Sequence, residues 1–307
     1  MSEVLKKVIT AEEFAAALGL ELLCGRGTAF ELVTRDINRP GLQLTGMGAG
    51  FDKGRVQVLG PSEMEYICSL KEAEKRQMLT VYFKQDFPCV VLSRALEPDG
   101  TLLEFADDSG IPLFRGDCTT SALCNRIADF LAIFLAHEEQ IHGVLMDVNG
   151  VGVLLKGKSG VGKSEIALEL VAHGHRLASD DAVIIKRIGD RIIGYAPPVV
   201  RHFSEVRGIG LIDVVSLFGA EAAKLEQQIE LVIELENWNE KKEYERVGRD
   251  TEKEYLLGVP LVKMTIPVSP GRNVAVIVEI AASVYRQRMM GFIAAEELER
   301  RLGKGKK

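Results

Sequence analysis

One segment of eight residues constrains this chain more than any other. It reads GKSGVGKS and matches the GxxxxGK(S/T) pattern of a phosphate-binding loop. Its glycines let the backbone turn with the N–H groups pointing inward around an anion, while the lysine and the last hydroxyl serve phosphates and Mg²⁺. The predicted phosphate-binding residues are Gly157, Lys158, Ser159, Gly160, Val161, Gly162, Lys163 and Ser164.

The sequence on either side fits a strand, a loop and a helix. An apolar, strand-like run precedes the loop, and a helix is predicted from Glu165 to Ala172. The positive end of that helix would face the same phosphates as the loop. A glycine-rich turn that binds nothing is the weaker interpretation, because both required neighbours are present.

A hairpin is predicted directly before the loop. Asn149–Gly150 is typical of a two-residue turn, because both central positions of that turn require a positive φ angle. The turn pairs Val148 with Val151. Continued without a bulge, the same ladder pairs His142 with Gly157, so we predict that His142 lies beside the phosphate loop.

Two adjacent aspartates, Asp180 and Asp181, stand just before a hydrophobic strand. Neighbouring residues of a strand point to opposite faces, so the two carboxylates are expected to have different roles. One could act as a base toward an incoming hydroxyl while the other touches a metal or a structural partner. A solvated turn is the alternative for such a pair taken alone.

Three later segments carry charged residues that could serve phosphate chemistry. In Ser204–Asp213, Glu205 could bind a metal and Arg207 could contact a phosphate, whereas an ordinary ion pair within the loop remains an equal alternative. The loops Tyr244–Arg249 and Pro267–Asn273 also contain arginines, which can clamp phosphoryl oxygens in a bidentate manner.

The first part of the chain alternates short helices and strands and shows no phosphate loop or metal spacing. Ala11–Leu18 is predicted as a helix with Thr10 as its N-cap and Glu13 at the capping-box position. Further predicted elements are strands at Arg55–Val58 and Cys89–Leu92 and a helix at Glu63–Gln77.

A helix predicted at Asp129–Ile141 marks the boundary between two domains. We therefore expect an N-terminal α/β domain over residues 1–130, of regulatory or assembly role, and a catalytic domain over residues 131–307. The chain of 307 residues is long enough for each domain to bury its own core.

Composition excludes several classes of protein. A net charge of −6 argues against a nucleic-acid-binding protein, and the chain contains no apolar run of the ~20 residues that a membrane span requires. The acidic N-terminus does not fit an export signal. The five cysteines lack a CxxC spacing, so we expect reduced thiols and a cytoplasmic location.

Taken in order, these motifs resemble the HPr kinase/phosphorylase family of bacteria. The resemblance covers the whole chain in layout, and its specific motifs lie mainly between His142 and Asn273. They are HGVL, the phosphate loop followed by Glu165, GHRLASDD, EVRGIGLIDV, YERVG and PVSPGRN, with MMGFIAAEELERRL as the last helix.

The resemblance implies a P-loop kinase domain like that of phosphoenolpyruvate carboxykinases. It also implies an enzyme that phosphorylates a serine of the phosphocarrier protein HPr with ATP or pyrophosphate, and removes that phosphate by phosphorolysis. The enzyme would use Mg²⁺, form a hexamer and act in the control of carbon metabolism.

The same resemblance implies roles for individual residues. Asp180 would take the proton of the HPr serine in the kinase reaction and return one in the reverse reaction. A raised pKa of Asp180, caused by the neighbouring Asp181 carboxylate, would serve both directions. The other implied residues are His142, Lys163 and Arg246 in catalysis, and Ser164 and Glu205 as Mg²⁺ ligands.

The chain departs from the family pattern at two positions. Position 158 is lysine, where the family usually has an acid (GESG or GDSG), and position 269 is serine, where PVRPGRN is usual. Our hypothesis is that kinase activity is retained while the balance between the two reactions is shifted. Two other functions stay open: a P-loop kinase of another protein or small molecule, and a non-enzymatic ATP-binding sensor.

Overall fold

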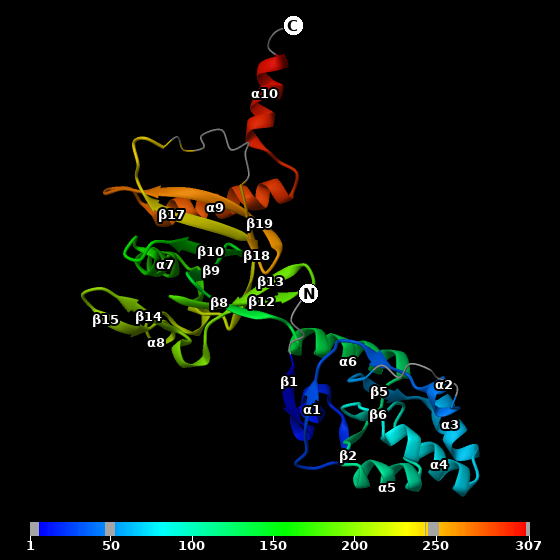
Figure 1. Cartoon of the computed structure of the whole chain (residues 1–307). Helices are drawn as coiled ribbons and strands as arrows, with labels where there is room; N and C mark the ends of the chain where they lie inside the picture. The colour runs from blue at the N-terminus through cyan, green and yellow to red at the C-terminus, as the bar shows by residue number, and fades with distance from the viewer. Residues whose placement is uncertain (1–5, 47–52, 243, 245–251, 305–307) are drawn as a thin grey trace. The chain divides into compact units, whose positions relative to one another are not determined.

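The computed structural model describes residues 6–46, 53–242, 244 and 252–304. Their mixed α/β structure confirms the predicted fold class. The chain divides into two compact units, Met1–Ala136 and His137–Lys307, which Figure 1 colours from blue to green and from green to red. This division lies a few residues beyond the expected boundary between residues 130 and 131.

The N-terminal unit is built on short, mostly parallel strands. They are β1 (Lys7–Thr10), β2 (Glu21–Cys24), β3 (Ala29–Leu32), β4 (Ile37–Asn38), β5 (Val56–Leu59), β6 (Val90–Leu92) and β7 (Leu113–Arg115). Five of them form a sheet in the order β2-β7-β6-β5-β4, in which only β2 runs antiparallel to its neighbour. Strands β1 and β3 form a separate antiparallel pair.

Helices cover both faces of the five-stranded sheet. They are α1 (Ala11–Leu18), α2 (Gly41–Leu44), α3 (Pro61–Ser69), α4 (Glu72–Phe83), α5 (Gly100–Asp108) and α6 (Thr120–Phe134). Alternate residues of β6 point to opposite faces: Val91 packs in one core with α1 and α6, and Val90 and Leu92 in another with α3, α4 and α5. The unit therefore has a helix–sheet–helix layering with two cores.

The structure confirms helix α1 and corrects one long helix. Thr10 accepts a hydrogen bond from the Glu13 amide, and the Glu13 carboxylate accepts one from the Thr10 amide, so the capping box is present. The helix predicted at Glu63–Gln77 is two helices, because Leu70 and Lys71 adopt extended backbone angles. The amide of Lys71 donates to Glu74, which starts α4 anew.

The helix predicted at Asp129–Ile141 is also wrong. Helix α6 begins earlier, at the Thr119 N-cap, and ends at Phe134. Strand β8 (Glu138–His142) follows it and belongs to the second unit. Leu135 and Ala136 are buried directly after the end of α6, so their apolar character does not indicate further helical turns.

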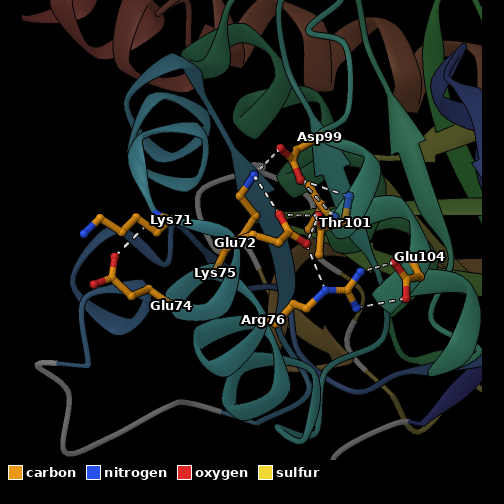
Figure 2. A network of polar contacts seen from close by, with 9 residues as sticks. Lys71, Glu72, Glu74, Lys75, Arg76, Asp99, Thr101 and Glu104 are labelled. Atoms are coloured by element: carbon orange, nitrogen blue, oxygen red, sulfur yellow. Dashed lines mark hydrogen bonds and ion pairs between the residues drawn. The ribbon is translucent and has the colours of Figure 1, made fainter.

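A network of charged side chains fixes α5 against α4 (Figure 2). The Lys75 ammonium donates to Asp99 at 2.6 Å, and the other Asp99 oxygen caps α5 by accepting from the Thr101 amide. Arg76 binds both oxygens of Glu104 at 2.7 and 3.0 Å. Lys75 and Arg76 of α4 thus each have an acidic partner on α5 or at its N-cap.

The C-terminal unit contains two larger sheets and a small hairpin. Its strands after β8 are β9 (Val144–Val148), β10 (Val151–Gly157), β11 (Arg176–Ser179), β12 (Ala182–Ile188), β13 (Arg191–Tyr195), β14 (Phe203–Val206), β15 (Gly210–Asp213), β16 (Glu226–Ile229), β17 (Leu231–Asn237), β18 (Glu252–Leu256) and β19 (Val259–Val268). One sheet has the order β11-β9-β10-β17-β19-β18, with β10, β17 and β19 parallel, and the other has the order β16-β13-β12-β8.

Strand β10, which leads into the phosphate loop, is buried on both faces. Val153 and Leu155 pack in one core with helices α7 (Lys163–Ala172) and α9 (Val274–Met289), whereas Leu154 packs in another with Val183 and Ile185 of β12. The central position of this strand gives the loop a rigid support (Figure 1).

The remaining described helices of this unit are the α-helices α8 (Val214–Phe218) and α10 (Ala294–Lys304) and two short 3-10 helices, η1 (Pro198–Val200) and η2 (Ala220–Ala222). The predicted last helix, Met289–Leu302, thus starts later than expected, after a turn at Gly291. None of the helices in the described ranges is both long and apolar enough to cross a membrane.

Candidate active site

The turn before the phosphate loop has the predicted form. Asn149 and Gly150 have φ angles of 54° and 83°, and Val148 pairs with Val151. The ladder between β9 and β10 ends where Val144 pairs with Leu155.

The predicted pairing of His142 with Gly157 is wrong. The chain changes direction at Gly143 and β8 joins the other sheet, where His142 pairs with Ala182 of β12. The sequence contained no break that would show this change of sheet. His142 nevertheless reaches the aspartate pair, because its Nδ1 lies 2.9 Å from Asp181 Oδ1 and 3.0 Å from the Asp181 carbonyl oxygen.

The entry to the loop accepts only glycine. Gly157 pairs with Leu235 of β17, and a Cβ atom at position 157 would lie 2.4 Å from the Leu235 carbonyl oxygen. Gly157, Gly160 and Gly162 have φ angles of 144°, 83° and 98°. These positive angles are what a backbone needs to turn its amides inward around an anion.

Lys163 lies inside the loop that it serves. Its side chain is buried, and its ammonium donates to the carbonyl oxygens of Gly157 at 3.1 Å and Lys158 at 3.4 Å. Helix α7 begins at Lys163, two residues before the predicted start at Glu165. Because Gly162 precedes it, no side chain caps its first turn, and the amides there remain available for a phosphate.

Asp180 brings three elements together. It lies in the turn between β11 and β12 and is only 6% exposed. Its Oδ1 accepts a hydrogen bond from Ser164 Oγ at 2.9 Å, and its Oδ2 accepts one from Ser204 Oγ. The phosphate loop, the aspartate turn and strand β14 therefore meet at one carboxylate.

Burial raises the pKa of Asp180 above its ordinary value, and the hydrogen bonds from Ser204 and Ser164 act in the opposite direction. The neighbouring Asp181 charge contributes least to this rise. The direction agrees with the prediction, but the cause that we assigned to it is wrong: the pKa rises because the carboxylate has lost water, and only slightly because of Asp181.

The two aspartates have separate environments, as expected. Asp181 is exposed, has a φ angle of 66° and contacts His142, whereas Asp180 is buried against the phosphate loop. Strand β12 follows directly at Ala182.

The hairpin of β14 and β15 borders the loop. Ser204 is 2% exposed and holds Asp180, while the next residue, Glu205, is exposed. Arg207, in the turn of the hairpin, places its guanidinium over Gly160 of the phosphate loop. Because side chains alternate along a strand, Glu205 and Ser204 point to opposite faces of β14.

Comparison with known proteins assigns the chain that carries this site to a family. The profile described as HPr Serine kinase C-terminal domain matches residues 134–302, and the one described as HPr Serine kinase N terminus matches residues 9–131. The chain belongs to the HPr kinase/phosphorylase family.

Two relatives that match over nearly the whole chain agree with this assignment. The HPr kinase/phosphorylase of Alkaliphilus metalliredigens is 43% identical over 300 residues, which cover 97% of each chain. That of Shouchella clausii is 42% identical over 296 residues, which cover 96% of each chain. A solved structure of the Hpr(Ser) kinase/phosphatase from Coxiella burnetii is 30% identical, with a TM-score of 0.47, and covers 52% of this chain and 98% of that one.

Of the two later segments of the family pattern that contain arginines, the structure describes only one in full. Arg246 lies outside the described residues. The segment Pro267–Asn273 contains the last two residues of β19 and the turn before α9, in which Arg272 donates to the Pro267 carbonyl oxygen and Asn273 caps α9. Ser269 is half-buried in this turn, and its carbonyl oxygen accepts from the Arg272 amide.

Ser204 is the site residue that the sequence did not indicate. It stood at the start of a segment noted for Glu205 and Arg207, and a serine there is ordinary in composition. Only the fold shows that it holds Asp180.

Proposed function

We propose that this chain transfers a phosphoryl group from ATP or pyrophosphate to a serine of HPr, and dephosphorylates phosphoseryl-HPr by phosphorolysis. The observation that carries the proposal is the buried Asp180 carboxylate, hydrogen-bonded to Ser164 of the phosphate loop. A general base next to a phosphoryl donor is what a serine acceptor requires, because its hydroxyl is a poor nucleophile.

The residues divide the work between donor and acceptor. Lys163, the loop amides and the first turn of α7 hold the donor phosphates. Asp180 accepts the proton of the acceptor hydroxyl as its oxygen bonds to phosphorus and the bond to the leaving phosphate breaks. In the reverse direction Asp180 returns a proton to the serine oxygen while inorganic phosphate takes the phosphoryl group, which yields pyrophosphate. The raised pKa of Asp180 favours such proton exchange in both directions.

Hydroxyl and carboxylate oxygens suit Mg²⁺, and we propose Ser164 as a ligand because it lies in the phosphate loop beside Asp180. Glu205, the second ligand that the resemblance implies, is exposed on the face of β14 opposite Ser204, so its place in the proposed set rests on the resemblance alone. In the described ranges no group of three or more His, Cys, Asp or Glu side chains could hold a metal. That fits Mg²⁺, which keeps several waters and binds through few protein oxygens together with substrate phosphates. Ser164 donates its proton to Asp180, so its lone pairs stay available. When bound, Mg²⁺ neutralises charge on the donor phosphates.

His142 and Arg246 complete the proposed catalytic set. The contact of His142 with Asp181, the neighbour of the proposed base Asp180, supports its place in this set. We also propose that the protein forms a hexamer and is located in the cytoplasm. The five cysteines are all free, which agrees with a reducing compartment.

Incubation with labelled ATP, Mg²⁺ and purified HPr tests the proposal directly. We expect label on an HPr serine, and its release as labelled pyrophosphate when excess inorganic phosphate replaces ATP. If the label reaches only acceptors other than HPr, HPr is not the substrate. If the protein binds ATP but transfers no label, the result contradicts an enzymatic role. A variant HPr without the acceptor serine is the matched control.

A further inference from the structure

The carboxyl ends of the parallel strands β10, β17 and β19 form one edge of the six-stranded sheet, and the phosphate loop follows the first of them. Strand β10 ends at Gly157, which pairs with Leu235 of β17. Strand β17 runs on beyond that level, and the amide of Trp238 donates to the Val268 carbonyl oxygen at the end of β19 at 2.9 Å. At about 3.3 Å per residue, Trp238 lies roughly 10 Å further along the strand direction than the entry to the loop.

Trp238, the single tryptophan of the chain, presents an exposed aromatic surface at this edge. Its indole stacks on the Tyr244 ring, with the ring centroids 5.1 Å apart and the ring planes at 29° to each other. Trp238 nevertheless remains 51% exposed. Because tryptophan is highly buried on average in folded proteins, a tryptophan that is backed by one ring and otherwise open indicates a binding surface.

Polar contacts hold the stacked pair in place. The Tyr244 hydroxyl accepts a hydrogen bond from the Asn239 amide at 3.1 Å. The Lys242 ammonium lies 5.7 Å from the centroid of the Tyr244 ring and donates to Glu236 of β17 at 2.9 Å. The aromatic surface is therefore fixed by β17 and the segment directly after it, and its ordering adds little to the cost of binding a ligand.

A nucleotide donor needs such a surface in addition to the loop. The loop amides and Lys163 serve the phosphates, whereas the ribose and the base extend beyond them. Proteins bind nucleobases by stacking them on aromatic rings, and every base has a flat face that can stack. A ring at the same sheet edge as the loop, and on the adjacent strand, is suitably placed for the base.

We infer that Trp238 determines donor specificity: the adenine of ATP stacks on its exposed indole while the phosphates occupy the loop. This inference rests on the proposed phosphoryl transfer and names the residue that recognises the nucleoside part of the donor. Pyrophosphate has no base and binds through the loop alone. No bond forms or breaks at Trp238, so it acts on the affinity for ATP and not on the chemical step.

A contact surface for the acceptor protein is the competing explanation, since tryptophan is enriched in protein interfaces. The two explanations differ in which substrate loses affinity when the ring is removed. A stack with the base affects ATP alone, whereas an interface contact affects HPr with either donor.

The binding of both donors to one variant separates these explanations. We expect Trp238→Ala to weaken the binding of Mg²⁺–ATP by about tenfold and to leave that of Mg²⁺–pyrophosphate within about twofold, both measured by titration calorimetry. Trp238→Phe keeps a flat ring and should recover most of the ATP affinity. In transfer assays, Trp238→Ala should raise KM for ATP with little change in kcat.

Tyr255→Ala is the matched control, because Tyr255 is an exposed aromatic residue of the same unit on strand β18. It should leave the binding of both donors within about twofold of the unsubstituted protein. Thermal unfolding of each variant checks that the fold is intact.

Unchanged ATP binding in Trp238→Ala would overturn the inference, and a raised KM for HPr would then assign Trp238 to the acceptor surface. Equal losses for ATP and pyrophosphate would also overturn it, because they would indicate a disturbed phosphate loop. If only ATP binding is weakened while the unsubstituted protein transfers nothing to HPr, the contact with the base stands and the proposed acceptor fails instead.

Discussion

Two hydrogen-bonded aspartates, one in each unit, have opposite environments. Asp99 in the N-terminal unit accepts from the Lys75 ammonium and from two backbone amides of α5. Burial alone would raise the pKa of Asp99, but these partners hold it below its ordinary value. Asp180 in the C-terminal unit is held by two serine hydroxyls, and burial raises its pKa.

The two carboxylates differ both in their partners and in their depth of burial, since Asp99 is half-buried and Asp180 is buried. A carboxylate paired with an ammonium has its charge compensated within the protein, so it stabilises the fold and resists protonation. A carboxylate held only by neutral donors keeps an uncompensated charge in a poorly hydrated place. The first arrangement serves stability and the second serves proton transfer.

The largest expected effect is on catalysis at Asp180. Asp180→Asn should lower the rate of phosphoryl transfer by about 10³-fold or more, because the amide cannot accept the acceptor proton. Nucleotide binding should stay nearly unchanged, since the phosphates are held by the loop and Lys163. Steady-state transfer assays together with equilibrium ATP binding measure both.

Asp99→Asn is the matched control in the other unit, because the same change there removes the charge that pairs with Lys75 and not a catalytic group. It should leave transfer per folded molecule unchanged. Loss of ATP binding in Asp180→Asn would instead indicate a structural or metal-holding role for that residue.

For the free energy of unfolding, we expect the opposite order of effects: Asp99→Asn should be costly and Asp180→Asn should not. Asp99→Asn removes the nearest negative charge from the Lys75 ammonium, and this should cost about 2 kcal/mol of unfolding free energy. Asp180→Asn should be neutral or stabilising, because it removes an uncompensated charge. Denaturant unfolding of both variants checks the comparison.

Arg76→Ala provides the reference for an exposed pair in the same network. Its partners Glu72 and Glu104 are exposed, so the cost should be below about 1 kcal/mol. An equal cost for Asp99→Asn and Arg76→Ala would show that burial of the Lys75–Asp99 pair has no special effect.

The two aspartates should also respond to acid with opposite signs. The folded-state pKa of Asp99 lies below 3.8, so its stabilising contribution is full above that value and is lost as pH falls through the folded pKa. For Asp180 the folded-state pKa lies above 3.8, so its cost to stability is present at neutral pH and disappears as pH falls through the folded pKa.

Unfolding free energies measured from pH 7 downward test these signs. Asp99→Asn should flatten the loss of stability in acid, and Asp180→Asn should remove a small gain. The same pH profile in both variants would contradict opposite shifts.

The smallest expected effect concerns the two departures from the family pattern. Ser269→Arg restores a positive charge beside α9 and should shift the ratio of kinase to phosphorylase activity while both remain measurable. Parallel assays of the two directions give this ratio. An unchanged ratio would remove Ser269 as a cause of altered balance, and Lys158→Glu then tests the other departure.

Local signals in the sequence predicted much of this structure. The α1 capping box, the Asn149–Gly150 turn and the phosphate loop follow from residues within a few positions of each other. Their geometry depends on short-range hydrogen bonds and on the φ angles that glycine and asparagine permit. The separate environments of Asp180 and Asp181 were predicted from strand alternation, but this reason was wrong, because both residues lie in the turn between β11 and β12, where Asp181 has a φ angle of 66°.

What failed depended on contacts between distant segments. His142 was assigned to the wrong strand because the change of sheet at Gly143 is decided by packing rather than by local pattern. Ser204 gave no local signal, and its hydrogen bond spans 24 residues of sequence. The cause of the Asp180 pKa shift was misjudged, since desolvation depends on tertiary burial that one sequence does not show.

The most direct measurement is the pKa of each of these two carboxyl groups in the same protein, followed by NMR of aspartate labelled at the side-chain carbon. Asp99→Asn and Asp180→Asn assign the two signals. The account predicts that Asp180 titrates above the ordinary aspartate value of 3.8 and that Asp99 titrates below it. An Asp180 that titrates at or below 3.8 would contradict the view that this carboxylate is held ready for proton transfer.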